Sequence, residues 1–385
     1  MATPFVYDKY VTGKDFIGRK EDCKILGNML SQGEHIVLYE PLKSGKKSLL
    51  QQTFFNMKMQ GKRFYAAQFT VFNIRTSEEF LLRLGSTALR AFCSTPSEFS
   101  DAVSALLSGT HFVFDPKRYA DHDEVISTGW ELDASDMAAM LRLPHAIAKA
   151  HGGHLFLIIE EFQNISLFED DWELLRALEA AVKEMRQTGD PIPGCTYIFS
   201  GSEVNAMKDI FEHHRYFYRN IEHIQLSTVS DREIVEHAVK GFLSGGKVIE
   251  RELLHGTCQL FRNNLWYINH FLYICDSLSK GYIVESTLLE ALDKLVAVHE
   301  PRFMSMMNGL TSHQVSLLRA ILEGYSKFST AEVIDKYGLN SSANVKRVKD
   351  ALMKKEVITF NEKDEPVILD PLFEYWVKKN YFRIK

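Results

Sequence analysis

The most constraining feature of this sequence is a run of five apolar residues, 155–159 (LFLII), that ends in two glutamates. A strand with apolar side chains on both faces must be buried on both faces, which is typical of parallel sheets covered by helices. Similar short runs alternate with amphipathic patterns of helical spacing, as in α/β folds. We therefore predict an α/β fold with a parallel sheet whose strands lie at 35–39, 63–72, 155–159, 196–199 and 221–226.

Helical patterns separate these strands, and the pattern changes twice further along the chain. The segment 94–135 is polar with weak periodicity, so we expect an elaboration there. At 385 residues, with 45% hydrophobic and 25% charged residues, the chain is long enough for two to three globular domains. Helices are predicted at 47–60, 77–92, 135–150, 172–187 and 203–211.

The region after residue 230 shows no strand pattern for about 75 residues, and we predict a helical domain there. Its helices are expected at 231–243, 250–261, 266–279 and 286–299. From residue 310, three short helices (311–322, 330–337 and 342–355) precede two strands (357–360 and 366–369), which is the winged-helix order. The predicted domains are an α/β core at 1–228, a helical domain at 229–305 and a winged-helix domain at 306–385.

A possible phosphate-binding loop lies where the first strand meets the first long helix. In the pattern GxxxxGK[ST], backbone N–H groups and the lysine contact phosphates, and the hydroxyl ligates Mg²⁺. Gly45 and Lys46 fit this pattern, but Glu40 stands at the first glycine position and Lys47 at the hydroxyl position. An ammonium group cannot ligate a cation. Ser48 follows, but one residue along a helix turns its side chain by about 100°.

Two acidic residues follow the apolar strand at 155–159. In phosphate-loop NTPases the first acid at this place holds the Mg²⁺ shell and the second polarises the attacking water. Glu160 and Glu161 are therefore candidates for these roles; the alternative is a strand end with two solvated acids. Ser200 and Ser202, which follow the strand at 196–199, have small polar side chains suited to sensing a γ-phosphate.

The order of these motifs resembles the archaeal-type ATPases of the STAND group, within the AAA+ branch of P-loop NTPases. The resemblance spans nearly the whole chain, from Phe16 to Trp376. It implies a five-stranded parallel core, a helical lid at 229–305 and a C-terminal winged helix. The residues that carry it are FIGR at 16–19, the loop at 39–50, the strand ends at 157–163 and 197–202, and DPLF at 370–373.

The resemblance also implies binding of ATP and Mg²⁺, with a role for particular residues. Glu160 matches the magnesium acid, which acts through water, and Glu161 the catalytic glutamate. Arg219 resembles an arginine that faces the phosphates; the alternative is an ordinary surface arginine. The residues matched to nucleotide binding are Gly45, Lys46, Lys47 and Ser48 in the phosphate loop, Gly18 and Arg19 against the adenine, and Ser200 or Ser202 at the sensor position.

The sequence departs from this family at several places in one site. The family has Gly-x-Pro in the lid, packed on the base, whereas this chain has Asn263-Asn264-Leu265. Together with Glu40 and Lys47, this affects the phosphate loop, the metal site and the base pocket. We therefore expect a nucleotide-binding switch whose ATPase activity is weak or lost. The alternatives are a degenerate interaction scaffold, with an unknown protein partner or self-association, and a DNA-binding regulator.

The charge distribution bears on the DNA alternative. The net charge is −5, whereas a protein coated in nucleic acid is usually more basic, so any such surface must be local. Residues 311–385 carry 13 Lys and Arg against 10 Asp and Glu, a net +3, which leaves −8 for the rest. DNA binding through 342–355 is one interpretation; a solvated helix face is the other. The cations of this helix are Lys346, Arg347, Lys349, Lys354 and Lys355.

The remaining signals indicate an ordinary reduced protein. The N-terminal segment has no apolar core of a secretory signal, and no apolar run is long enough to cross a membrane, so we expect a cytoplasmic protein without a membrane partner. The five widely spaced cysteines are expected to be buried thiols. The histidines at 151, 154, 213 and 214 lack metal-site spacing and suggest surface loops. Aromatic residues between 261 and 273 are expected to pack in a core.

Overall fold

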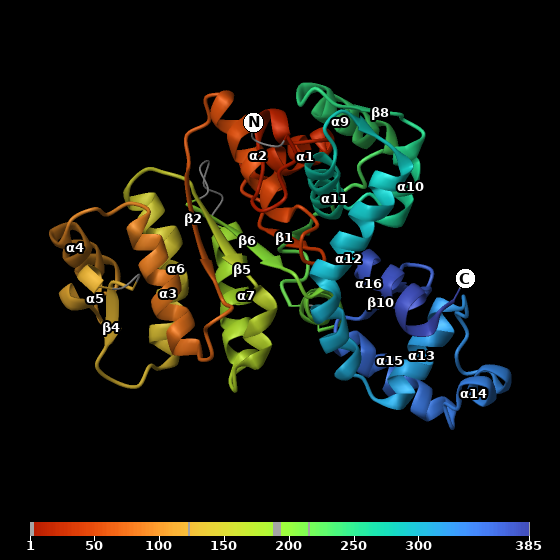
Figure 1. The fold of residues 1–385 in the computed structure, drawn as a ribbon. Helices are drawn as coiled ribbons and strands as arrows, with labels where there is room; N and C mark the ends of the chain where they lie inside the picture. The colour runs from red at the N-terminus through yellow and green to blue at the C-terminus, as the bar shows by residue number, and fades with distance from the viewer. Residues whose placement is uncertain (1–3, 122–123, 188–193, 215, 385) are drawn as a thin grey trace. The chain divides into compact units, whose positions relative to one another are not determined.

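The computed structural model describes residues 4–121, 124–187, 194–214 and 216–384. The chain forms two compact units, which are described separately (Figure 1). The core unit comprises residues 21–40 and 53–226. The lid unit comprises the N-terminal segment up to Lys20, residues 41–52 and the chain from Ser227 onward.

A five-stranded parallel sheet forms the centre of the core unit and confirms the predicted α/β fold. Its strand order is β2-β5-β6-β1-β7. Residues 155–159 of β5 are all buried, as their apolar side chains require. Since the strands are parallel, β1, β5 and β6 all end at the same edge of the sheet. The strands are β1 (Ile36–Tyr39), β2 (Tyr65–Thr70), β5 (Leu155–Glu160), β6 (Cys195–Gly201) and β7 (Glu222–His223), the last shorter than predicted.

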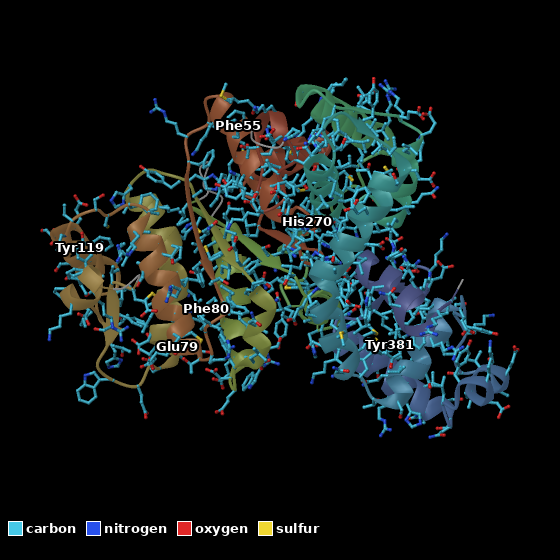
Figure 2. The ribbon with its side chains drawn as sticks, viewed as in Figure 1. Phe55, Glu79, Phe80, Tyr119, His270 and Tyr381 are labelled. Atoms are coloured by element: carbon cyan, nitrogen blue, oxygen red, sulfur yellow. The ribbon has the colours of Figure 1, made fainter. Side chains whose placement is uncertain are left out.

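Helices with one apolar face complete the core unit, and their starts are set by capping residues. Thr76 accepts a hydrogen bond from the backbone of Glu79 at the start of α3. This helix packs against α6, and its Phe80 is fully buried (Figure 2). The helices are α1 (Lys20–Ser31), α2 (Lys46–Met59), α3 (Ser77–Arg90), α6 (Ala134–Ala150), α7 (Asp171–Gln187) and α8 (Val204–Lys208), the last followed by a π-helical turn, Asp209–His213. Residues 46–52 of α2 belong to the lid unit.

The elaboration at 94–135 is more regular than its weak periodicity suggested. A capping box between Thr95 and Glu98 begins a helix that buries only Phe99 and Val103, so little of its pattern is visible in the sequence. Two three-residue strands pair antiparallel after it. The elements are α4 (Pro96–Leu106), β3 (Phe112–Phe114), α5 (Pro116–Asp121) and β4 (Ile126–Thr128).

Four helices of the lid unit lie where they were predicted, with two differences. Two strands of two residues each pair in parallel, where no strand was expected, because so short a ladder leaves no sequence pattern. The last helix continues to Asn308 through Pro301, and Phe303 and Met307 are buried on it. The elements are α9 (Asp231–Ser244), β8 (Val248–Ile249), α10 (Leu253–Leu260), α11 (Leu265–Leu278), β9 (Tyr282–Ile283) and α12 (Glu285–Asn308).

The C-terminal part of the lid unit has the predicted order of three helices and an antiparallel hairpin. Its buried side chains form one cluster with those of the preceding helices, in which Phe303 contacts Phe373 and Trp376. No helix in the described residues is long and apolar enough to span a membrane. All five cysteines are buried and free, as predicted. The elements are α13 (Ser312–Leu322), α14 (Ala331–Tyr337), α15 (Ser342–Lys354), β10 (Ile358–Phe360), β11 (Pro366–Ile368) and α16 (Pro371–Trp376), followed by a π-helical turn, Val377–Phe382.

Candidate functional site

The predicted phosphate loop ends at a helix N-terminus in the lid unit. Gly45 has φ 99°, a conformation that a residue with a Cβ rarely adopts. The helix α2 begins at Lys46, and its first turn closes with a bond from Leu49 N to Gly45 O at 3.0 Å. The Lys46 ammonium donates to Pro41 O across the loop at 3.2 Å. Backbone N–H groups in the first turn of a helix favour anions, and α2 presents such a terminus at the end of this loop.

Arg19 lies directly on this loop. Its Nη1 donates to Ser44 O at 2.8 Å and its Nε donates to Ser227 O at 2.8 Å. A Cβ placed on Gly45 would lie 2.8 Å from Arg19 Nη1, so this close approach also requires glycine. Gly18 has φ 64°, and a Cβ there would lie 2.9 Å from Val229. The structure therefore brings three predicted residues together, Gly18, Arg19 and Gly45.

Three residues near the phosphate loop bear on the missing metal-binding hydroxyl and the missing first glycine: Ser48, Lys47 and Glu40. Ser48 Oγ accepts the backbone N–H of Val11 at 3.1 Å, so it is directed at the N-terminal segment, consistent with its position one residue further along α2. Lys47 occupies the first turn of α2 at the position of the metal-binding hydroxyl. In the core unit, Glu40 Oε1 accepts the backbone N–H of Leu226 at 3.3 Å. The Glu40 carboxylate is thus bonded to the main chain that follows β7.

A loop lysine contacts the lid helix α11. Lys43 has φ 67°, and its Nζ lies 3.5 Å from the centroid of the Trp266 ring, a cation–π contact. Burial lowers the pKa of Lys43, and repulsion from Arg302 lowers it further. At the start of α11, Asn263 Nδ2 donates to Val229 O at 2.9 Å and to Asp231 Oδ1 at 2.7 Å. The Asn-Asn-Leu segment is therefore tied to the start of α9.

Most of the aromatic residues around α11 pack as predicted. Phe261, Tyr267 and Phe271 are buried in the lid unit, whereas Tyr273 is partly exposed. His270, labelled in Figure 2, stacks on the ring of Tyr7 with centroids 4.0 Å apart. Trp266 is partly buried against the same core, and its ring also contacts Lys43.

A network of charged and polar groups links the lid helices to α16. Asp370 accepts hydrogen bonds from Tyr267 Oη, at 2.9 and 2.8 Å, and from Arg302 Nη2. The same carboxylate caps α16 through the N–H groups of Leu372 and Phe373, each at 3.0 Å. One side chain thus connects α11, α12 and the first helix after the wing.

The predicted catalytic glutamate lies in the core unit at the end of β5. Glu161 has φ 53°, in the left-handed region, and follows Glu160, the last residue of β5. Its Oε2 accepts bonds from Ser202 Oγ at 2.6 Å and from Gln163 Nε2 at 2.7 Å. Burial and the charge of Glu161 raise the pKa of Glu203.

Two other predicted residues of the core unit, Ser200 and Arg219, have different surroundings. Ser200 lies on β6 opposite Leu38 of β1, one position before the sheet edge. Arg219 is exposed in the turn before β7, has φ 62°, and lies 5.1 Å from the ring of Tyr218. Sequence reasoning did not assign a role to Gln163; its place two residues after Glu161 was the available signal.

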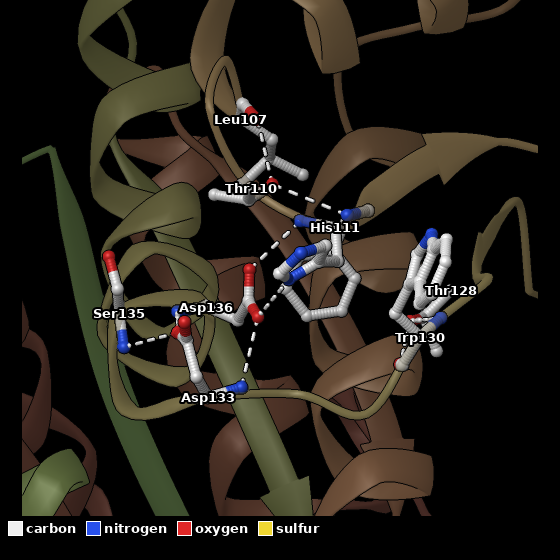
Figure 3. A network of polar contacts seen from close by, with 9 residues as sticks. Leu107, Thr110, His111, Thr128, Trp130, Asp133, Ser135 and Asp136 are labelled. Atoms are coloured by element: carbon white, nitrogen blue, oxygen red, sulfur yellow. Dashed lines mark hydrogen bonds and ion pairs between the residues drawn. The ribbon is translucent and has the colours of Figure 1, made fainter.

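One group in the described residues has metal-ligand spacing, namely His111, Asp133 and Asp136 in the elaboration (Figure 3). Asp136 accepts from His111 N at 2.9 Å, from Asp133 N at 3.0 Å and contacts His111 Nδ1 at 2.8 Å. Asp133 Oδ1 caps α6 through the N–H groups of Ser135 and Asp136. The hydrogen bond in which Asp136 accepts from the His111 ring raises the pKa of His111. These contacts describe a helix cap, and they use the carboxylate oxygens that a metal would need.

Solved structures with a similar fold include a protein described as an ATPase and an ORC protein solved in two nucleotide states. A Walker-type ATPase of Pyrococcus abyssi superimposes with a TM-score of 0.67 and 17% identity, over 97% of this chain and 99% of that one. The ORC2 protein of Aeropyrum pernix, in its ADPNP–ADP complexes, gives a TM-score of 0.57 and 13% identity over 95% and 93% of the two chains. The ADP form of the same protein gives a TM-score of 0.55 and 14% identity, over 96% of this chain and 95% of that one. This is the fold of a P-loop ATPase.

The C-terminal part of this P-loop fold is matched independently. Residues 301–379 match the family model of a probable winged helix domain. No curated protein matches the sequence significantly. The P-loop ATPase fold with a C-terminal winged helix, predicted from the sequence, is confirmed.

Proposed function

We propose that this protein is an ATP-binding switch of the archaeal-type STAND kind within the AAA+ ATPases, with weak or no hydrolysis. The observation that carries the proposal is the glycine–lysine loop at the start of α2. Gly45 has a positive φ and no room for a side chain, and Lys46 reaches across the loop. A strand of the parallel sheet, β1, leads directly into this loop.

The residues of this loop suit the phosphate groups of ATP, but they lack the hydroxyl group that would ligate Mg²⁺. Backbone N–H groups of the first turn of α2 and the Lys46 ammonium would hold the phosphates, and Gly18 and Arg19 would lie at the base. Glu160 would contact the Mg²⁺ shell through water. The hydroxyl ligand is replaced by Lys47, so we assign no step to the metal. If hydrolysis takes place, Glu161 would polarise the attacking water, Ser200 or Ser202 would act as the sensor, and Arg219 would be the arginine that faces the phosphates.

Contacts within the lid unit provide a route by which ATP would change the lid and the winged helix. A phosphate near the loop attracts the Lys43 ammonium, which is now held on Trp266 of α11 at 3.5 Å. The same helix carries Tyr267, which is bonded to Asp370 at the start of α16. Release of Lys43 would therefore loosen α11 and, through Asp370, the segment after the wing. In this proposal residues 1–228, 229–305 and 306–385 act as core, lid and winged helix.

Hydrogen exchange on addition of ATP tests this switch. We expect changed protection of α11 and α16 in the wild type and none in Lys46→Ala. Lys58→Ala is the matched control, because Lys58 is an exposed lysine near the end of the same helix. Equal responses of Lys46→Ala and wild type would refute the proposal. A cellular phenotype that survives Lys46→Ala would favour the interaction scaffold, with a protein partner or self-association.

DNA binding through residues 342–355 is the second candidate function. Lys346, Arg347 and Lys354 are exposed on α15, and Lys355 is exposed just after it. Lys349 lies 3.5 Å from Asp364 and over the ring of Phe360. Beside α15 lies a hollow of about 730 Å³. It is lined by Lys327, Lys346, Lys349, Asp350, Asp364, four hydroxyl residues and the apolar Phe328 and Val345.

Fluorescence anisotropy with duplex DNA over a salt series tests this second function. Cations on a recognition helix contact phosphates, so affinity should fall as salt rises. We expect Lys346→Ala to weaken binding. Lys336→Ala is the control, because Lys336 is already paired with Glu323 at 3.1 Å. No binding at about 50 mM salt, where phosphate contacts are strong, would refute the idea.

A further inference from the structure

Two buried histidines of the lid unit lie around one tryptophan. The ring of Trp266 contacts the rings of His270 and His299, with centroids 5.3 and 5.5 Å apart, and the two imidazoles lie 5.7 Å from each other. His270 is 7% exposed and His299 8%. His270 Nδ1 and His299 Nε2 are buried and have no hydrogen-bond partner among the described residues. A protonated imidazole donates from both nitrogens, so a charge on either ring would leave a buried N–H without an acceptor.

A positive charge already lies on the same tryptophan. Lys43, in the loop 41–45, places its Nζ 3.5 Å from the centroid of the Trp266 ring. Burial, followed in size by repulsion from Lys43, lowers the pKa of His270 and of His299 to about 4. An ammonium group on Trp266 and an imidazolium beside it would therefore repel each other where little water can screen them.

The other ionisable groups around the two rings do not offset this repulsion. Asp370, at the start of α16, accepts from Tyr267 Oη and Arg302 Nη2 and also caps its own helix, so its oxygens are in use. Arg302, on α12, lowers the pKa of His299 further. Tyr7, from the N-terminal segment, stacks on His270, and burial raises its pKa, so it stays neutral in acid. The remaining ionisable groups on these elements are Asp8 and Tyr273, which act on Tyr7, and Glu300, which accepts from Trp376 Nε1.

We infer that the Lys43 ammonium on Trp266 and a proton on His270 or His299 exclude each other, so that acidification releases the loop 41–45 from α11. While Lys43 lies on Trp266, both imidazoles stay neutral. Protonation of either ring repels Lys43, and the departure of Lys43 relieves that repulsion. Coupled equilibria are reciprocal, so removal of the Lys43 charge must also favour proton uptake by the histidines. No nucleotide takes part in this exchange, and its test is separate from that of the proposed function.

NMR titration of the two histidines tests the coupling of the charges. Lys43→Met keeps a side chain of similar length and removes the charge. We expect the pKa of His270 and of His299 to rise in this variant by at least about 0.5. Lys294→Met is the matched control, because Lys294 lies on α12, as His299 does, but pairs with Glu290 at 3.4 Å. This control should leave both histidine titrations unchanged.

The release of the loop is followed through the ε-methylene protons of Lys43. The ring current of Trp266 shifts these protons upfield while Lys43 lies on the ring, and their signal is assigned by its absence in Lys43→Met. In the wild type the signal should move to the position of a solvated lysine as the histidines titrate, between pH 6.5 and about pH 4. In His270→Phe/His299→Phe, which keeps two aromatic rings but no titrating group, it should stay upfield over the same range.

Three results would overturn the inference. Unchanged histidine titrations in Lys43→Met would show that the charges do not interact. A Lys43 signal that stays upfield while the wild-type histidines titrate would show that protonation does not release the loop. Equal movement of the signal in the double variant would assign the release to other groups. If the double variant does not fold, His270→Phe and His299→Phe are used singly, and each should release Lys43 with the titration of its remaining histidine.

Discussion

Replacing Gly45 by alanine tests the phosphate-loop geometry most sharply. The φ of 99° is unfavourable for alanine, at a cost of roughly 1–2 kcal/mol. The added Cβ would lie 2.8 Å from Arg19 Nη1, so the guanidinium must move away from Ser44 O. A lost hydrogen bond to a charged group costs about 1.5–3 kcal/mol, and less for a half-buried arginine such as this one. We expect Gly45→Ala to lower the free energy of unfolding by about 2–3 kcal/mol.

Urea-induced unfolding measures this effect, and the chain supplies a matched control. Gly13 also has a positive φ, 65°, but a Cβ there would meet no atom within 4 Å. Gly13→Ala should therefore carry only the conformational cost, about 1 kcal/mol. The difference between the two variants isolates the contact between Arg19 and the loop. Equal destabilisation by Gly45→Ala and Gly13→Ala would refute the described packing of Arg19.

Two further predictions concern the lid unit. Burial lowers the pKa of His270 and of His299 from 6.5 to about 4, so each imidazole is neutral in the folded protein at pH 7. The stability that each contributes is therefore present above pH 6.5 and is lost as the pH falls toward 4. Between pH 7 and pH 5 the wild type should lose about 2 kcal/mol more unfolding free energy than His299→Phe; equal losses in urea titrations would contradict this. Asp370→Ala removes a helix cap and the partner of Arg302, and should lower the midpoint of unfolding by the equivalent of about 3 kcal/mol. Asp364→Ala is the control, because the Asp364 carboxylate is exposed and pairs only with Lys349, at 3.5 Å. This variant should change the midpoint by the equivalent of less than about 1 kcal/mol. Similar midpoints for both variants would argue against the Asp370 network.

Elements with a strong local pattern could be predicted from the sequence. The apolar strand β5 and the helices α3, α9 and α13 lie within a few residues of their predicted bounds, because burial of one face leaves a regular spacing. The two-residue strands β8 and β9 could not be found, since a ladder of that length has no periodicity. The extension of α12 past Pro301 depends on the burial of Phe303, which tertiary packing decides.

The sequence predicted which residues belong to the candidate site, but it did not predict most of the contacts between their side chains. The edge of a parallel sheet brings residues from the ends of β5 and β6 together, and Glu161 and Ser202 are indeed in contact. The sequence did not indicate the contact between Lys43 and Trp266 or the bond from Gln163 to Glu161. Lys43 and Glu161 both have positive φ angles. Lysine and glutamate rarely adopt this conformation, so the sequence does not predict it at these positions.

Equilibrium titration with ATP, with and without Mg²⁺, tests the central claim most directly. The account predicts weak binding, with a dissociation constant on the order of 0.1–1 mM. The affinity should change little with Mg²⁺, because Lys47 replaces the metal-binding hydroxyl, and should fall at least about tenfold in Lys46→Ala but not in Lys58→Ala. No binding at about 10 mM ATP, or equal binding by wild type and Lys46→Ala, would contradict nucleotide binding at this loop. Micromolar, Mg²⁺-dependent binding with steady turnover would contradict the claim that hydrolysis is weak or lost.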